Sequence, residues 1–94
     1  MKFTPLEWKL KFSGENKCFL KMICNKLDKE RVIGFHLLSP NAGEILQGVS
    51  VAMNLGARKE DFDNTIGIHP TIGEEMTINR ITKSSNEPFD KGNC

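Results

Sequence analysis

The residues of this chain that could do chemistry together lie in one short run, TIGIHPTIGEE, from Thr65 to Glu75. The run places His69 directly before Pro70 and five residues ahead of Glu74. A histidine titrates near neutral pH, so its ring can take up and return a proton. A carboxylate that accepts a hydrogen bond from the far ring nitrogen fixes the tautomer and raises the basicity of the ring. One interpretation of the spacing is therefore an acid–base pair of His69 and Glu74.

The same residues also have structural interpretations, which the spacing leaves open. Thr71 and Glu74 fit the T-x-x-E pattern of a capping box, in which the glutamate carboxylate binds a backbone N–H at a helix start. His69 would then be a partly buried ring bonded to a carbonyl. Pro70 favours an extended conformation for His69 in either case. The run contains no cysteine, so a thiol for acid–base chemistry must come from another chain or from the tail.

The three cysteines differ in what they could do. Cys18 and Cys24 are six residues apart on one face of a predicted strand, which places them about 20 Å apart. A disulfide needs Cα atoms within about 7 Å, so we expect both thiols to pack in the core instead. Cys94 is the last residue of a polar tail and is expected to be accessible to chemistry.

Charge and composition exclude several classes of function. The net charge is +1 with the two signs mixed, which argues against a nucleic-acid surface. The chain has no glycine-rich phosphate-binding motif, no convincing metal-ligand spacing and no apolar run long enough to cross a membrane. It also has no secretory signal, so we expect reduced cysteines and a cytoplasmic location.

Alternating apolar residues predict three antiparallel strands, at Leu6–Phe12, Lys17–Asn25 and Arg31–Ser39. The polar connection Lys26–Glu30 suits a hairpin. The third strand is almost entirely apolar at its centre, so we expect it to be buried on both faces.

The apolar spacing then changes to the period of a helix. Asn41 and Glu44 resemble a capping box at the start of this helix, and Gly56 is expected to end it. A short helix is expected at Arg58–Asp63 and a final helix at Ile72–Ile81.

These elements predict an α+β fold, an antiparallel β-sheet with helices packed on one face. The second face of the sheet, with Trp8, Phe19 and Ile23, is left partly uncovered, and such a surface needs a partner or a missing piece of chain. We expect residues 1–83 to form one domain and residues 84–94 to form a flexible tail.

Several segments occur together at fixed spacing. They read F-T-P-L-E-W, N-K-C, K-M-I-C-N, R-V-I-G-F-H-L-L-S-P-N-A-G-E-I-L-Q-G, D-N-T-I-G-I-H-P-T and I-T-K-S-S. From about Phe3 to Lys83 they closely resemble the C-terminal interface domain of animal thioredoxin reductases. The I-T-K-S-S stretch is most similar to the thioredoxin-glutathione reductase branch.

This resemblance implies a mechanism. Members of the family are FAD- and NADPH-dependent homodimers, and their last domain forms most of the dimer interface. The His-Pro step reaches across that interface to a dithiol beside the partner's flavin, where the histidine stabilises a thiolate and moves its proton and the glutamate orients the histidine. By motif match, His69 and Glu74 take the catalytic roles, and His69 and Pro70 lie at the partner's cofactor site. Thioredoxin or glutathione-linked substrates are implied for the parent enzyme, in the cytoplasm or, alternatively, in mitochondria.

The sequence also departs from the family. It has no dinucleotide-binding domains, so neither FAD nor NADPH is expected to bind this chain alone. It starts part-way into the interface domain, which we interpret as a partial dimerisation domain truncated at the N-terminus. The tail ends Gly92-Asn93-Cys94 where the family has Gly-Cys-selenocysteine-Gly. Cys94 therefore takes the position of the selenocysteine as a candidate catalytic thiol, with no vicinal cysteine to pair with.

Two functions remain open at this point. The chain is either the part of a thioredoxin or thioredoxin-glutathione disulfide reductase that supplies the His/Glu pair to a partner subunit, inactive by itself, or a non-catalytic module that dimerises or docks on a full-length reductase.

Overall fold

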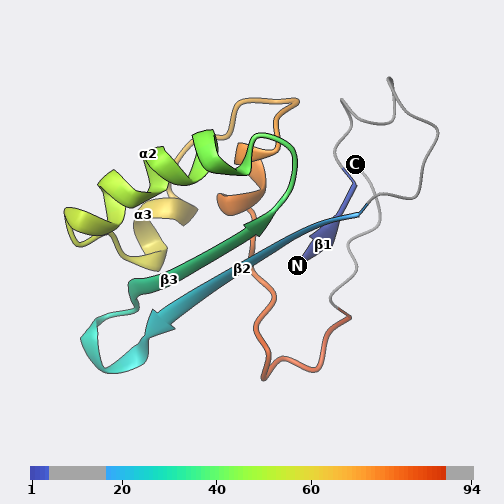
Figure 1. Cartoon of the computed structure of the whole chain (residues 1–94). Coiled ribbons are helices and arrows are strands. Elements are labelled where there is room, and N and C mark those ends of the chain that lie inside the picture. Colours follow the sequence, from blue (N-terminus) through green and yellow to red (C-terminus); the bar gives the residue numbers. More distant parts are fainter. Residues whose placement is uncertain (5–16, 89–94) are drawn as a thin grey trace.

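The computed structural model describes residues 1–4 and 17–88. Three strands, β1 (Lys2–Phe3), β2 (Cys18–Asn25) and β3 (Arg31–Leu38), form an antiparallel sheet in the order β1-β2-β3 (Figure 1). The second and third strands agree with the prediction to within one residue. The strand expected at Leu6–Phe12, which includes Trp8, lies outside the described residues.

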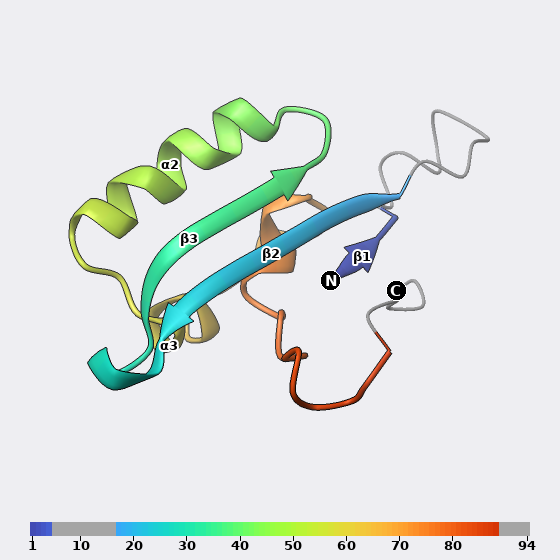
Figure 2. The same ribbon diagram turned by 60° about the horizontal axis from the view of Figure 1, so that its bottom comes forward.

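Two helices and two 3-10 turns complete the described part of the chain. They are α2 (Ala42–Asn54), α3 (Lys59–Asp63), η1 (Lys26–Asp28) and η2 (Gly73–Met76). Both helices lie on the same side of the sheet, with α2 running alongside β3 (Figure 2). The predicted α+β class, with helices on one face of an antiparallel sheet, is therefore confirmed. Among the described residues, no helix is long and apolar enough to cross a membrane.

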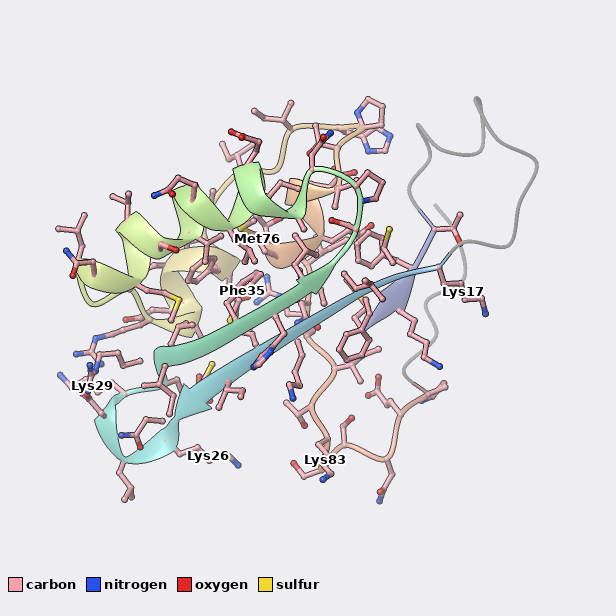
Figure 3. The ribbon with its side chains drawn as sticks, in the orientation of Figure 1. Lys17, Lys26, Lys29, Phe35, Met76 and Lys83 are labelled. Atoms are coloured by element: carbon pink, nitrogen blue, oxygen red, sulfur yellow. The ribbon has the colours of Figure 1, made fainter. Side chains whose placement is uncertain are left out.

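The core lies between this face of the sheet and the helical layer. One cluster of buried side chains joins the two first strands to the residue before η2; it consists of Met1, Phe3, Cys18, Leu20 and Ile72. A second joins β3 to α2 and α3 and consists of Val32, Val49 and Phe62. Phe35 and Met76 pack against both clusters (Figure 3), so they link the two halves of the core.

Both described cysteines serve as apolar packing groups, as predicted. Cys18 is 2% exposed in the first cluster, and Cys24 is partly buried against the second. Neither forms a disulfide. Burial is the main cause that raises the pKa of the Cys24 thiol, and the nearby Glu30 carboxylate adds to it. Cys24 is therefore held as a thiol and is a poor nucleophile.

The prediction that the third strand is buried on both faces is wrong. Ile33 is 54% exposed and Leu38 is 68% exposed. Helices cover only the face that carries Val32, and β3 is the last strand in the described sheet. Its apolar run therefore lies partly on the uncovered side, next to Ile23 of β2, which is 40% exposed.

The hairpin between β2 and β3 is fixed by Asp28. Its carboxylate accepts from Arg31 Nε at 2.5 Å, and Arg58 Nη1 donates to its backbone carbonyl at 2.5 Å. The hydrogen bond from Arg31 is the main cause that lowers the pKa of Asp28 below its usual value. These contacts join the hairpin to the start of α3, 30 residues further along the chain.

The ends of the helices agree only in part with the sequence patterns. Gly56 follows α2 with φ of +84°, a conformation that favours glycine, so the predicted stop is confirmed. Asn41 precedes α2 but has φ of +55° and forms no side-chain cap, so the predicted capping box is wrong. In this left-handed conformation Asn41 contributes its carbonyl, which accepts from the N–H of Ile45 at 3.1 Å.

The predicted final helix, Ile72–Ile81, is also wrong: only the four residues of η2 are helical, in a 3-10 turn. The backbone N–H and the hydroxyl of Thr77 both donate to the carbonyl of Glu74, at 2.9 and 2.8 Å. This i to i+3 bond occupies the acceptor that an α-helix would offer to residue 78. Glycine at 73 and threonine at 77 are also weak helix formers, so little opposes the early end.

Candidate functional site

The candidate site lies on the connection between α3 and η2, the yellow-orange segment in Figure 1. Thr65 lies two residues after the end of α3, and its hydroxyl donates to the carbonyl of Asp61 at 2.7 Å. Beyond it the chain presents apolar side chains to solvent: Ile66 is 91% exposed and Ile68 is 76% exposed. The side chain of His69 follows them and is 59% exposed. The imidazole is thus displayed on an exposed apolar loop, and the interpretation as a partly buried ring is wrong.

His69 and Glu74 meet at this site. His69 Nδ1 lies 2.9 Å from Glu74 Oε1, and the Glu74 side chain is 20% exposed. A carboxylate can only accept, so Nδ1 carries the proton of this bond. In the neutral ring Nε2 is then left as an acceptor that can take up a proton.

The capping-box interpretation of Glu74 is half right. The hydroxyl of Thr71 accepts from the backbone N–H of Glu74 at 3.1 Å, as a cap residue does. The Glu74 carboxylate forms its bond to His69 and not to a backbone N–H at the turn start. The five-residue spacing therefore leads to a contact between the two side chains.

Three further residues hold this arrangement, and the sequence patterns did not single them out as parts of a site. The Thr71 hydroxyl, besides capping η2, donates to the carbonyl of Ile68 at 2.6 Å. Thr77 holds the carbonyl of Glu74. A Cβ at Gly67 would lie 2.9 Å from the Cβ of Glu74, so the loop approaches η2 too closely for a side chain there. Of these three residues, only Thr71 belonged to a sequence pattern, T-x-x-E, and that pattern predicted a helix cap.

The structure also places Pro70, the other candidate residue that it describes, and His36, the second histidine of the chain. Pro70 is exposed and is joined to His69 by a cis peptide bond. His36 is exposed on β3, opposite Lys21 of β2. Cys94 lies outside the described residues, and whether it reaches His69 stays a prediction. Within residues 1–4 and 17–88, no group of three or more histidine, cysteine, aspartate or glutamate side chains could hold a metal ion.

Comparison with known families gives this geometry its context. Residues 1–80 match the family model described as the pyridine nucleotide-disulphide oxidoreductase, dimerisation domain. The chain belongs to this family. The antiparallel sheet with helices on one face is the fold expected for that domain, and the resemblance inferred from the sequence motifs is confirmed.

Three similar curated proteins are described as thioredoxin reductases. The chain is 51% identical over 92 residues to thioredoxin reductase SEP1 of Emiliania huxleyi, which covers 98% of the chain and 19% of that protein. It is 47% identical over 78 residues to thioredoxin reductases from two isolates of Plasmodium falciparum, which covers 82% of the chain and 14% and 13% of those proteins. The chain therefore spans less than a fifth of the length of these relatives.

Proposed function

We propose that this chain is the dimerisation-domain part of an FAD- and NADPH-dependent thioredoxin disulfide reductase, and that His69 and Glu74 are its acid–base pair. The observation that carries the proposal is the 2.9 Å contact between His69 Nδ1 and Glu74 Oε1 on an exposed loop. An exposed imidazole is hydrated by water and does not need a carboxylate partner to be stable at the surface. An oriented and exposed imidazole is suited to a reacting group that approaches from outside the chain.

The chemistry proposed for His69 is proton transfer in thiol–disulfide exchange. When a thiolate attacks a disulfide, one sulfur leaves with the electron pair and must be protonated or stabilised. The protonated ring of His69 donates from Nε2 to this leaving sulfur, and the neutral ring takes a proton from an attacking thiol. Glu74 holds Nδ1 and stabilises the positive charge that the ring carries between the two steps.

The described residues around His69 do not fit an FAD or NADPH site. The exposed loop beside His69 carries Ile66 and Ile68, and the sequence has no glycine-rich turn to bind a pyrophosphate. FAD and NADPH, which supply the electron pair, would be bound by other domains of the assembly. The exposed isoleucines favour a loop that packs against a second subunit, as the family name implies.

A chimeric enzyme tests this proposal. The chain is grafted in place of the matching 92 residues of the Emiliania huxleyi reductase, and NADPH-dependent disulfide reduction is measured. His69→Gln is expected to lower turnover by ~10²-fold or more, the usual effect of losing a general acid–base group. The matched control is His36→Gln, which removes the other histidine, on β3, and should leave turnover unchanged. Equal rates for both variants would return His69 to a structural role.

A further inference from the structure

The His69–Glu74 contact lies where side-chain contacts are weak. The two side chains are 59% and 20% exposed, so solvent and salt screen their attraction. Holding two flexible side chains in one geometry also costs conformational entropy, and exposed pairs often contribute little for both reasons. A well-populated contact therefore requires that the backbone place the two residues in advance.

One side chain connects the backbones on both sides of this contact. The Thr71 hydroxyl donates to the carbonyl of Ile68 at 2.6 Å and accepts from the N–H of Glu74 at 3.1 Å. The Ile68 carbonyl belongs to the peptide unit that leads into His69. A hydroxyl is the smallest side-chain group that donates and accepts at one atom, so valine, which has the same shape, could form neither bond.

The backbone of Glu74 is also fixed from its other side. The hydroxyl of the buried Thr77 donates to the Glu74 carbonyl at 2.8 Å. The Cβ of Glu74 lies against the backbone of Gly67, where an added Cβ would approach to 2.9 Å. The C=O of Glu74 is thus bound by Thr77, its Cβ lies close to Gly67, and its N–H is bound by Thr71.

We propose that Thr71 is the positioning residue of the His69–Glu74 pair. Its hydroxyl joins the Ile68 carbonyl to the Glu74 N–H, and this holds the carboxylate at Nδ1 and the proton of the neutral ring on that nitrogen. The consequence for turnover rests on the function proposed above. The consequence for the imidazole does not, because it belongs to the chain itself.

The tautomer of His69 tests this proposal in the 94-residue chain labelled with ¹⁵N-histidine. Imidazole nitrogen shifts report whether the neutral ring carries its proton on Nδ1 or Nε2. We expect Nδ1–H to dominate in the wild type. In Thr71→Val the Nδ1–H to Nε2–H ratio should fall about tenfold, because the charged carboxylate of Glu74 is no longer held at Nδ1 and losing one hydrogen bond to a charged group usually costs about this factor. Thr71→Ser keeps the hydroxyl and should restore the ratio.

Two controls separate positioning from folding. Thr65→Val removes another exposed threonine-to-carbonyl bond, at the end of α3, and should leave the ratio unchanged. If Thr71→Val does not fold, Gly67→Ala tests the same geometry, because the added Cβ displaces Glu74 while every hydroxyl remains. A folded Thr71→Val variant with the wild-type ratio overturns the proposal. If Thr71→Val does not fold, a folded Gly67→Ala variant with the wild-type ratio overturns it instead.

Failure of this inference is distinguishable from failure of the proposed function. A changed tautomer ratio in Thr71→Val together with full turnover of the His69→Gln chimera supports the positioning role and refutes the catalytic one. An unchanged ratio together with a slow His69→Gln chimera refutes the positioning role and leaves the catalytic one standing.

Discussion

At the scale of single residues, the site depends on the charge of one carboxylate. The bond between Glu74 Oε1 and His69 Nδ1 orients the ring, and the negative charge stabilises the protonated imidazole. Oriented hydrogen bonds to ionised groups are roughly twice as strong as those between neutral groups. The effect of the charge of Glu74 can therefore be tested separately from the effect of its size and shape.

Glu74→Gln tests this separation in the chimeric reductase. Glutamine keeps the size of the side chain and one acceptor oxygen but removes the charge, so turnover should fall roughly tenfold, less than in His69→Gln. The measurement is the steady-state rate of NADPH-dependent disulfide reduction. Glu60→Gln, an exposed glutamate of α3, is the matched control. A Glu74→Gln rate equal to that of the control would show that the charge has no part in the reaction.

The sequence allowed the two partners of this pair to be named, and it offered their contact as one of two interpretations, which the structure confirms. A histidine and a glutamate five residues apart, with a proline between them, meet only if the chain turns back after Pro70. The T-x-x-E pattern predicted a helix start after Pro70, with the carboxylate of Glu74 bound to a backbone N–H there. The close approach at Gly67 and the second bond of Thr71 come from the three-dimensional path of the loop, for which no sequence pattern exists.

At the scale of elements, periodicity predicted β2, β3 and the long helix α2 well, but it did not predict β1. Alternation over β2 and helical spacing over α2 each extend far enough that one face is clearly apolar. The errors fall where local hydrogen bonds decide the outcome. Thr77 ends η2 by binding the Glu74 carbonyl. Asn41, the residue before α2, has a left-handed conformation that its sequence neighbours do not reveal.

The hairpin between β2 and β3 gives a prediction about stability and pH. The pKa of Asp28 is lowered below its usual value of 3.8, mainly by the hydrogen bond from Arg31. A lowered pKa in the folded state means that the ionised carboxylate stabilises the fold above about pH 4 and that this contribution is lost as the pH falls below it. Removing the charge should therefore matter at neutral pH and not in acid.

Urea unfolding of Asp28→Asn and wild type at several pH values checks this expectation. The wild type should have the higher midpoint at pH 7, and the difference should shrink as the pH falls below about 4. The effect should be small, because Asp28 is exposed and its ion pairs are screened by salt. The control is Glu87→Gln, because Glu87 is exposed and lies far along the chain from the hairpin. Asp61 is not used as a control because its carboxylate caps α3. A difference that grows in acid would contradict the account.

At the scale of the whole molecule, several large apolar side chains are exposed on the described surface. Ile66 and Ile68 are exposed beside His69, and Ile33 and Leu38 are exposed on β3. Exposed apolar patches of this kind mark sites of association. The family of the chain, a dimerisation domain, offers a reason for them.

The isolated chain should therefore associate with itself and should not oxidise NADPH. Size-exclusion chromatography with mass detection is expected to give species larger than the 10.6 kDa of one chain. Ile33→Lys, on the uncovered side of the sheet, should shift the population towards the single chain because it places a charge on the apolar surface. A monodisperse single chain, or any NADPH-driven disulfide reduction by the chain alone, would be contrary to this expectation.

The family could be recognised from the sequence because its motifs are long and occur at fixed spacing. The residues alone could not tell whether His69 acts on a dithiol of its own chain or of another chain. A ring that is 59% exposed in a single chain does not identify the sulfur with which it exchanges a proton. The central claim is that this imidazole works on the dithiol of the partner subunit. In a symmetric dimer each site would then combine groups from both chains.

Subunit complementation tests that claim most directly. Chimeric subunits with His69→Gln are mixed with chimeric subunits that keep His69 but lack the flavin-side dithiol, and the purified heterodimer is assayed for NADPH-dependent disulfide reduction. Each homodimer should be nearly inactive. The heterodimer should regain one working site, in which the intact dithiol of one subunit meets the intact His69 of the other. A heterodimer as inactive as its two parents would contradict the account, because it would place His69 at the dithiol of its own chain or at neither.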